Sequence, residues 1–281
     1  MKLSICTIGD RSGNLTDMIP RLAALGYDGI ELWEGHVREA LMSSIYSDMN
    51  PDYETYRLGR EWEALFETAN ANRAIPCTVP VVAGYFRFFT EGTHNIHPIL
   101  LDDNMEKCRK MGILAKLLGG DKVRVMMDSI ASADATPEIW SQLANGLKEM
   151  ARAVQYLDVT LVLETHQGQL MDTTAATYKL LDKAGETNIK VNLDIHNLFA
   201  MGEDPLEALE ALYPQVVHVH LKNVDTNGKP VFLQSGTMDY EPFLRRIQEL
   251  GYDGFASVEW FGQDYWGMAA HELSWLRERM V

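Results

Sequence analysis

The sequence predicts a single-domain α/β fold, a (β/α)8 TIM barrel that spans residues 1–281. Short β-type runs alternate with longer helical patterns along the whole chain, and eight such pairs can be counted. This alternation is typical of a closed parallel barrel, whose usual length of about 250 residues is close to that of this chain. An internal echo supports repetition, because Leu-Gly-Tyr-Asp-Gly at 25–29 returns at 250–254, each time between a helix and a strand.

Each expected strand is a short run of apolar and β-branched residues, and each expected helix has apolar residues at helical spacing. The expected strands cover residues 3–8, 29–33, 75–82, 122–128, 159–165, 189–195, 216–222 and 255–260. The expected helices cover residues 15–25, 55–73, 97–118, 137–156, 173–185, 205–212, 239–250 and 265–279.

A doubly wound sheet is the alternative architecture for this alternation. It usually carries a Gly-rich phosphate turn after its first strand, and residues 8–13 match that fingerprint poorly. No Pro- or Ser-rich linker divides the chain, so we expect one domain. The long segments 34–54 and 83–97 follow strands, and we expect them to form walls or lids on the catalytic face of a barrel.

Composition limits the classes of function. The formal net charge of −15 opposes non-specific binding to nucleic acid, which depends on neutralising phosphates. Three widely spaced cysteines, Cys6, Cys77 and Cys108, are expected to be reduced thiols of a cytoplasmic protein. No leader-like start and no apolar stretch near 18 residues is seen, so neither secretion nor a membrane span is expected.

Four acidic or imidazole side chains stand at the ends of four successive apolar runs in the second half of the chain: Glu164, Asp194, His220 and Glu259. One acid at a strand end is commonly a helix cap. Four on consecutive strands favour a shared site, because the carboxyl ends of parallel barrel strands meet at one face. Three carboxylates and one imidazole suit one divalent cation, Mn²⁺, Mg²⁺, Co²⁺ or Zn²⁺.

Side chains two residues apart on a strand point to the same face, so Glu164 is accompanied by His166, Asp194 by His196 and His220 by His218. Each of these histidines can orient a ligand, contact substrate or be a hydrogen-bonded structural group.

Further residues are expected near the pocket from their position after strands. Trp33 and Lys222 are candidate substrate contacts together with His166 and His196, and Arg124 reaches either the site or a structural layer below it. The aromatic residues of 85–89 and 260–266 either face the pocket or pack in the core; those of 85–89 can also hold a subunit interface.

The motifs Leu-Glu-Thr-His at 163–166, Val-Asn-Leu-Asp at 191–194, His-Val-His-Leu-Lys-Asn at 218–223 and Ser-Val-Glu at 257–259 resemble the sugar isomerase and epimerase group of the xylose isomerase-like TIM barrels. The opening Gly-Tyr-Asp-Gly-Ile-Glu-Leu-Trp at 26–33 fits as well, so the resemblance covers nearly the whole chain.

The resemblance implies one divalent metal held by Glu164, Asp194, His220 and Glu259. It also implies that Glu164 and Glu259 act as acid and base on a small sugar or keto-polyol, through a metal-stabilised enediolate. The chain departs from the group at Asn197, where many relatives have histidine, and at Asn223, where many have aspartate after the lysine.

The first interpretation is therefore a metal-dependent isomerase or epimerase of a small sugar or keto-polyol. The alternative is a metal-dependent dehydratase of a keto-polyol such as an inosose, which shares the enediolate but then loses a hydroxyl. An endonuclease IV-like nuclease and a non-catalytic sugar-binding barrel are further alternatives. The negative net charge disfavours the nuclease, and the presence of two opposed glutamates disfavours the non-catalytic barrel. A small-molecule substrate is expected, with no nucleic-acid or membrane partner, and a homo-oligomer is left open.

Overall fold

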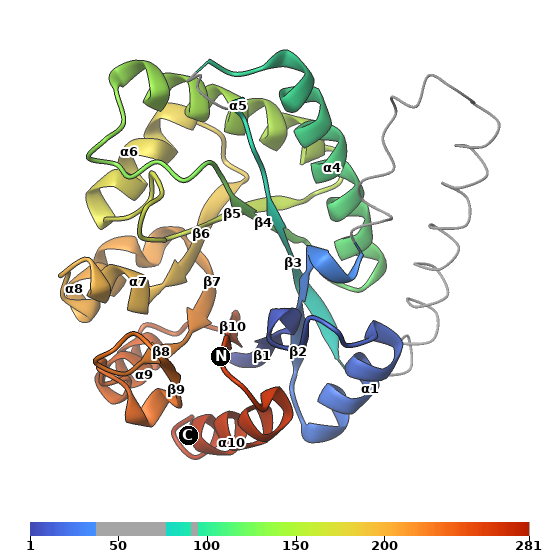
Figure 1. Ribbon diagram of the computed structural model, residues 1–281, viewed down its shortest axis with the longest axis vertical. Helices are drawn as coiled ribbons and strands as arrows, with labels where there is room; N and C mark the ends of the chain where they lie inside the picture. Colours follow the sequence, from blue (N-terminus) through green and yellow to red (C-terminus); the bar gives the residue numbers. More distant parts are fainter. Residues whose placement is uncertain (38–76, 91–94, 281) are drawn as a thin grey trace.

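A closed barrel of parallel strands forms the centre of the protein, and helices surround it (Figure 1). The computed structural model describes residues 1–37, 77–90 and 95–280. Eight strands of this described part close the barrel: β1 (Lys2–Cys6), β2 (Gly29–Trp33), β3 (Thr78–Tyr85), β4 (Lys122–Met126), β5 (Thr160–Glu164), β6 (Ile189–Asp194), β7 (Val216–Leu221) and β10 (Phe255–Val258). The predicted (β/α)8 fold is confirmed.

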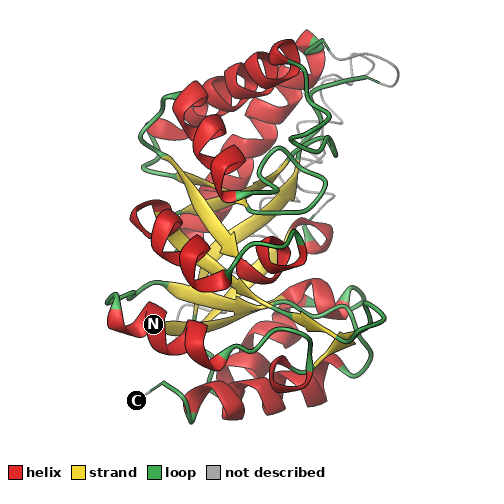
Figure 2. Cartoon of the chain, turned by 90° about the vertical axis from the view of Figure 1, so that its left-hand side faces the viewer, coloured by secondary structure: helices red, strands yellow, loops and turns green. Residues whose placement is uncertain are grey.

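The helices lie outside the strands, as the side view in Figure 2 also shows. They are α1 (Leu15–Leu25), α4 (Pro98–Leu117), α5 (Pro137–Gln155), α6 (Thr174–Ala184), α7 (Ile195–Ala200), α8 (Pro205–Leu212), α9 (Glu241–Glu249) and α10 (Tyr265–Arg277). Side-chain caps fix several starts: Thr136, Thr173 and Asp204 each accept a backbone N–H of the first turn. The expected helix at 55–73 falls outside the described residues.

Several element boundaries differ from the sequence-based expectation, most of them by one to three residues. β3 extends to Tyr85 instead of ending at residue 82, because Val81–Tyr85 pairs in register with Lys122–Met126 of β4. β6 ends at Asp194, since Asp194 caps α7, which begins at the next residue. A two-stranded hairpin of β8 (Asn223–Val224) and β9 (Pro230–Val231) was not expected; its turn is closed by Asp225, which accepts from the N–H groups of Asn227 and Lys229.

The barrel interior is polar, whereas the outward faces of the strands are apolar. Outward residues such as Leu161, Leu163, Val191 and Leu193 are fully buried against the helices. The alternating positions carry buried polar groups: Ser4, Glu31, Arg124, Glu164, Asn192, Asp194, His218, His220 and Ser257. Barrels are more often filled by branched aliphatic residues, so this interior points to a functional use of the barrel axis.

No helix in the described part of the chain is long and apolar enough to cross a membrane.

Glu272 of α10 is a buried carboxyl outside the barrel interior. Its Oε1 accepts the N–H of Leu233 at 2.8 Å, while Oε2 has no hydrogen-bond partner among the described residues. Burial raises the pKa of Glu272 to about 7. The ionised form is therefore disfavoured in the folded protein, and stability falls as pH rises from the unfolded-state pKa of about 4.3 through about 7.

We expect Glu272→Gln to remove this pH dependence. The amide keeps the acceptor for Leu233 but carries no charge, so the variant gains stability over the wild type above pH 7, by about 3 kcal/mol at most. Thermal midpoints of both proteins at pH 5 and pH 8.5 measure the difference. The exposed Glu278→Gln serves as control and should follow the wild type. If the thermal midpoints of Glu272→Gln and the wild type change equally with pH, burial does not raise the pKa of this carboxyl.

Candidate metal centre and active site

The four strand-end residues meet at the carboxyl end of the barrel. Glu164 is the last residue of β5, Asp194 the last of β6, His220 lies in β7, and Glu259 follows β10. One donor atom from each of the four lies within 4.8 Å of the others. All four are buried. Rigid strands thus hold three carboxylates and one imidazole close enough together for all four to contact one ion.

Two atoms of this cluster lack a hydrogen-bond partner among the described residues, and this suits binding of a divalent cation. Nδ1 of His220 and Oδ2 of Asp194 are buried and have no hydrogen-bond partner among the described residues. Nδ1 of His220 lies 3.4 Å from Oε1 of Glu164. An imidazole nitrogen without a hydrogen-bond partner, next to carboxylate oxygens, is a donor set that Mn²⁺, Co²⁺ and Zn²⁺ accept.

Arg124 governs the charge of Glu164. Its Nη1 donates to Oε2 of Glu164 at 2.5 Å, and both side chains are buried. Burial opposes ionisation of Glu164, but the charges of Arg124 and His220 outweigh it and hold the pKa of Glu164 well below its usual range. The structure therefore places the guanidinium of Arg124 beside Glu164, in the barrel interior, and not in a layer below the cluster.

Lys222 supplies the second cation. Its Nζ lies 2.7 Å from Oδ2 of Asp194, an ion-pair distance without hydrogen-bond geometry, and donates to Oε2 of Glu259 at 3.0 Å. Burial lowers the pKa of Lys222, yet the surrounding carboxylates, first of all Asp194, raise it well above its usual value. For Asp194, burial raises the pKa, and Lys222 offsets only part of that effect.

A layer below the cluster contains a residue that the sequence analysis missed. Oε2 of Glu31, on β2, lies 2.8 Å from Nε2 of His220 and 2.9 Å from Nε2 of His218. Burial raises the pKa of Glu31, but His220 and His218 outweigh this and lower it far below its usual value. The signal was present in the sequence, because a glutamate stands between Ile30 and Leu32 in an otherwise apolar strand.

The expected alternation after Asp194 is wrong, because the chain turns into α7 at Ile195 and the extended phase is lost. Asn197 becomes a structural anchor: its N–H donates to Oδ1 of Asp194 at 3.1 Å, and its Nδ2 donates to the carbonyl of Thr165 at 3.0 Å. His196 is buried, and its Nε2 has no hydrogen-bond partner in the described residues. Burial and the charge of Lys222 lower the pKa of His196 to about 4, so its ring is neutral.

His166 and Trp33 lie at the rim. His166 is half-buried, and its Nδ1 is 2.7 Å from the carbonyl of Gln167. Trp33 ends β2, its ring meets the ring of His36 edge-on at 5.4 Å, and its backbone N–H donates to Oγ1 of Thr7 at 3.0 Å. Their contacts are with neighbouring loops, so a substrate contact of either remains a prediction.

The departure at Asn223 has a structural reason. Its Nδ2 donates to the carbonyls of Leu233 and Met238, each at 2.8 Å, and its Oδ1 accepts the N–H of Met238 at 3.3 Å. The buried amide thereby holds both ends of the loop that contains β8 and β9. This task needs a donor and an acceptor, which an aspartate cannot supply together when ionised.

The aromatic segments divide between core and rim. Phe86, Phe88 and Phe89 are buried, whereas Tyr85 is 41% exposed. Tyr265 is buried, whereas Phe261 is 48% exposed. The buried residues therefore take the core alternative, and a pocket contact of Tyr85 or Phe261 stays a prediction.

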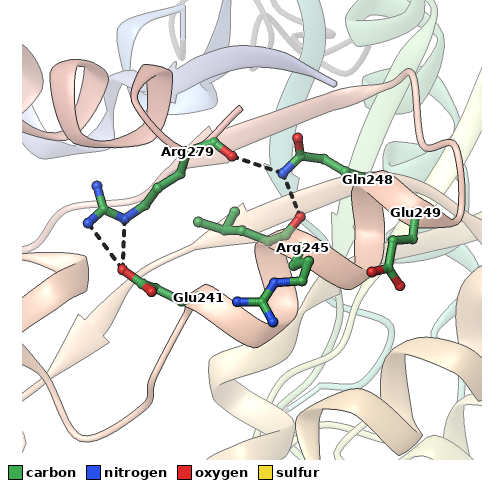
Figure 3. Close-up of a pocket in the computed structure, with 6 residues that line it drawn as sticks. Glu241, Arg245, Gln248, Glu249 and Arg279 are labelled. Carbon is green, nitrogen blue, oxygen red and sulfur yellow. Dashed lines mark hydrogen bonds and ion pairs between the residues drawn. The ribbon is translucent and has the colours of Figure 1, made fainter. Parts of the chain in front are cut away.

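A separate surface depression lies beside α9 and Arg279 (Figure 3). Part of its lining is engaged in internal contacts: Arg279 pairs with Glu241 at 3.1 Å, and Gln248 donates to the carbonyls of Leu244 and Arg279. It is lined by none of the residues at the barrel mouth, and the barrel end remains the candidate site.

Known proteins resemble this chain over its full length in one case and over less than half of it in another. A 3-dehydroshikimate dehydratase of Bacillus anthracis is 24% identical over 301 aligned residues, covering 99% of this chain and 98% of that protein. An inosose dehydratase of Clostridium perfringens is 30% identical over 140 residues, 43% of this chain and 47% of that protein.

Solved structures show the same fold. The crystal structure of the probable 3-DHS dehydratase AsbF from Bacillus anthracis has a TM-score of 0.80 at 24% identity, covering 99% of both chains. The IolI protein, whose crystal structure contains a bound zinc atom, has a TM-score of 0.73 at 19% identity and covers 100% of this chain and 97% of that one. The model of one family matches residues 19–279, nearly the whole barrel with its cluster of strand-end residues, and the chain belongs to that family, the xylose isomerase-like TIM barrels.

Proposed function

We propose that this chain is a divalent-metal-dependent dehydratase of a small cyclic polyhydroxy ketone. The observation that carries the metal site is the cluster of Glu164, Asp194, His220 and Glu259, with donor atoms within 4.8 Å of one another. The choice of dehydration over isomerisation or epimerisation is supported by the two relatives, which are named as dehydratases. The isomerase or epimerase that the sequence analysis placed first is the second candidate, because structures of sugar epimerases also share the fold.

The ligands of the metal are proposed to be the four residues of the cluster. A divalent ion bound there would polarise the substrate carbonyl and acidify the neighbouring C–H bond. The zinc atom bound in the structure of IolI, which shares this fold, supports a metal-dependent function for this chain. Four carboxylates in the barrel (Glu31, Glu164, Asp194 and Glu259) face two permanent cations, Arg124 and Lys222. Burial lowers the pKa of His220, but Glu31 and Glu164 raise it well above its usual value, so a divalent ion would take over the charge that a proton on His220 otherwise supplies.

The chain's own groups then move the protons. Arg124 keeps Glu164 ionised, which is the form that accepts a proton from the carbon next to the carbonyl. The C–H electron pair forms the new C=C bond, and the hydroxyl on the following carbon leaves with a proton as water. Glu259 and Lys222, 3.0 Å apart, stand together on the other side of the cluster and are the proposed source of that proton.

Two exposed rings support a cyclic substrate. The guanidinium carbon of Arg124 lies 5.0 Å from the ring centre of Tyr85, and Nζ of Lys222 lies 5.9 Å from that of Phe261. Each ring therefore adjoins one of the two cations of the site while leaving part of its face open. Such faces suit the apolar face of a six-membered ring, and suit a flattened, unsaturated product even better. His196 and Lys222 are the proposed polar contacts to the hydroxyl groups.

We expect one divalent ion per chain, and loss of most of it in Asp194→Ala and in His220→Ala. Each change removes one of four donors from the proposed ligand set. Proteins stripped with a chelator and reloaded with Mn²⁺, Co²⁺, Zn²⁺ or Mg²⁺ are analysed for bound metal after desalting. Asp225→Ala in the hairpin turn and His271→Ala, stacked on Phe232, are matched controls that should keep the ion. Full occupancy in the two ligand variants would contradict the metal assignment.

We expect Glu164→Gln and Glu259→Gln each to lower turnover by about 100-fold or more, because an amide keeps the size but transfers no proton. The assay offers inososes, 3-dehydroshikimate and ketoses, and follows loss of water by ultraviolet absorbance and exchange with deuterated water by NMR. Bound metal is measured in each variant, so that loss of the ion is not mistaken for loss of proton transfer.

The products decide between the two candidate functions. An unsaturated or dicarbonyl product with release of water supports the dehydratase. Epimerised ketoses without release of water would replace it by the epimerase. Turnover with no exchange or loss of the carbon-bound hydrogen would contradict proton abstraction by either glutamate.

A further inference from the structure

We infer that Glu31 is a positioning residue that fixes the imidazole of His220 so that its hydrogen is on Nε2 and its Nδ1 is free for the metal. The inference rests on the proposed metal centre and deepens it, because it assigns the coordinating atom and the group that presents it. Neither the strand-end pattern nor the relatives identify Glu31.

Glu31 reaches His220 from across the barrel. In the closed sheet, β1 and β10 lie between β2, which carries Glu31, and β7, which carries His220. The contact is therefore made through the interior, not between neighbouring strands. Oε2 of Glu31 lies 2.8 Å from Nε2 of His220, and both side chains are fully buried.

The contact determines where the hydrogen of His220 resides. Oε2 of Glu31 is an acceptor for two ring nitrogens at once, Nε2 of His220 and Nε2 of His218 at 2.9 Å. Both nitrogens therefore carry hydrogen. A neutral His220 with hydrogen on Nε2 has a lone pair on Nδ1, and this atom faces Glu164 at 3.4 Å within the cluster. A carboxylate that binds the far nitrogen of a coordinating histidine is a recurring means of fixing ring and tautomer.

The neighbours of Glu31 agree with this arrangement. The amide of Asn192 also approaches Nε2 of His220 at 3.0 Å, and its Oδ1 has no partner in the described residues. An amide turned by 180° would place Oδ1 against the N–H of His220 and move Nδ2 to the position that Oδ1 now occupies without a partner. On the other side, the hydroxyl of Ser257 lies 2.9 Å from Nε2 of His218 and 2.7 Å from the hydroxyl of Ser4. This chain of buried hydrogen bonds holds Glu31 and His218 in place.

A second cation is the competing interpretation, because one donor atom from each of Glu31, His218 and His220 also lies within 4.8 Å of the others. The hydrogen-bonded arrangement is favoured, since the two short contacts have ordinary hydrogen-bond lengths and account for both ring hydrogens. Metal stoichiometry separates the two, because a second site predicts two ions per chain.

The first test needs no substitution at Glu31. The wild-type enzyme is loaded with Zn²⁺, and a long-range proton–nitrogen NMR spectrum of its histidines is recorded, with the His220 signals identified by their absence in His220→Ala. We expect hydrogen on Nε2 and zinc on Nδ1. Zinc on Nε2 would overturn the inference. A wild type that takes up no metal would instead count against the proposed function, and two zinc ions per chain would replace the inference by the second site.

The second test measures what Glu31 contributes. The dissociation constant for Co²⁺ and the d–d absorption spectrum of the bound ion are compared in wild type, Glu31→Gln and Glu31→Asp. We expect Glu31→Gln to weaken binding by about 10–100-fold and to change the spectrum, because the amide no longer holds the ring as a charged acceptor. Glu31→Asp, which keeps the charge on a shorter side chain, should lie between the two. Glu272→Gln is the matched control, since it also removes a buried carboxyl but contacts neither histidine. Unchanged affinity and spectrum in both Glu31 variants would contradict the positioning role.

Discussion

The polar interior of the barrel is the constraint on which the rest of the structure depends. Burying a charge costs several kcal/mol unless it is paired, and this interior holds Arg124 and four carboxylates, with Lys222 at its mouth. Arg124 is assigned to Glu164, Lys222 to Asp194 and Glu259, and two histidines to Glu31. Four carboxylates against two cations leave two negative charges in excess. Burial lowers the pKa of His220, but Glu31 and Glu164 raise it well above its usual value, so a proton on His220 offsets part of this excess where no divalent cation is bound. The excess negative charge of the barrel interior therefore favours binding of a divalent cation.

The same residues that carry the charges also set the local chain path. Asp194 ends β6 and its side chain accepts the N–H of Asn197 in the first turn of α7, so one of its oxygens is committed to the backbone and the other faces Lys222. Asn223 holds the loop after β7, and the preceding residue is Lys222. Loop anchors therefore lie next to, or within, the candidate ligand set, and they restrict its geometry to that of the rigid strands.

The sequence predicted the barrel and the four strand-end residues because both depend on local pattern. Apolar runs identify the strands, and parallel strands bring their carboxyl ends together whatever the details of packing. The length of β3 could not be read from its own residues, since it depends on pairing with β4. The path after Asp194 followed a cap instead of strand alternation. The sequence pattern did not identify Glu31, because its role comes from contacts across the barrel with two histidines that lie 187 and 189 positions further along the chain.

Dehydration and epimerisation begin with the same removal of a proton, and the fate of the resulting enolate depends on which proton is delivered next. Epimerisation requires a proton at carbon from the opposite face, whereas dehydration requires one at the leaving oxygen. Arg124 keeps Glu164 in the accepting form, while Glu259 shares Lys222 with Asp194. For the proposed dehydratase, a cationic donor beside the second glutamate would stabilise the leaving oxygen, because that oxygen gains negative charge as it departs with its bonding electrons. The placement of the two cations, one beside each glutamate, is thus compatible with the proposed loss of water.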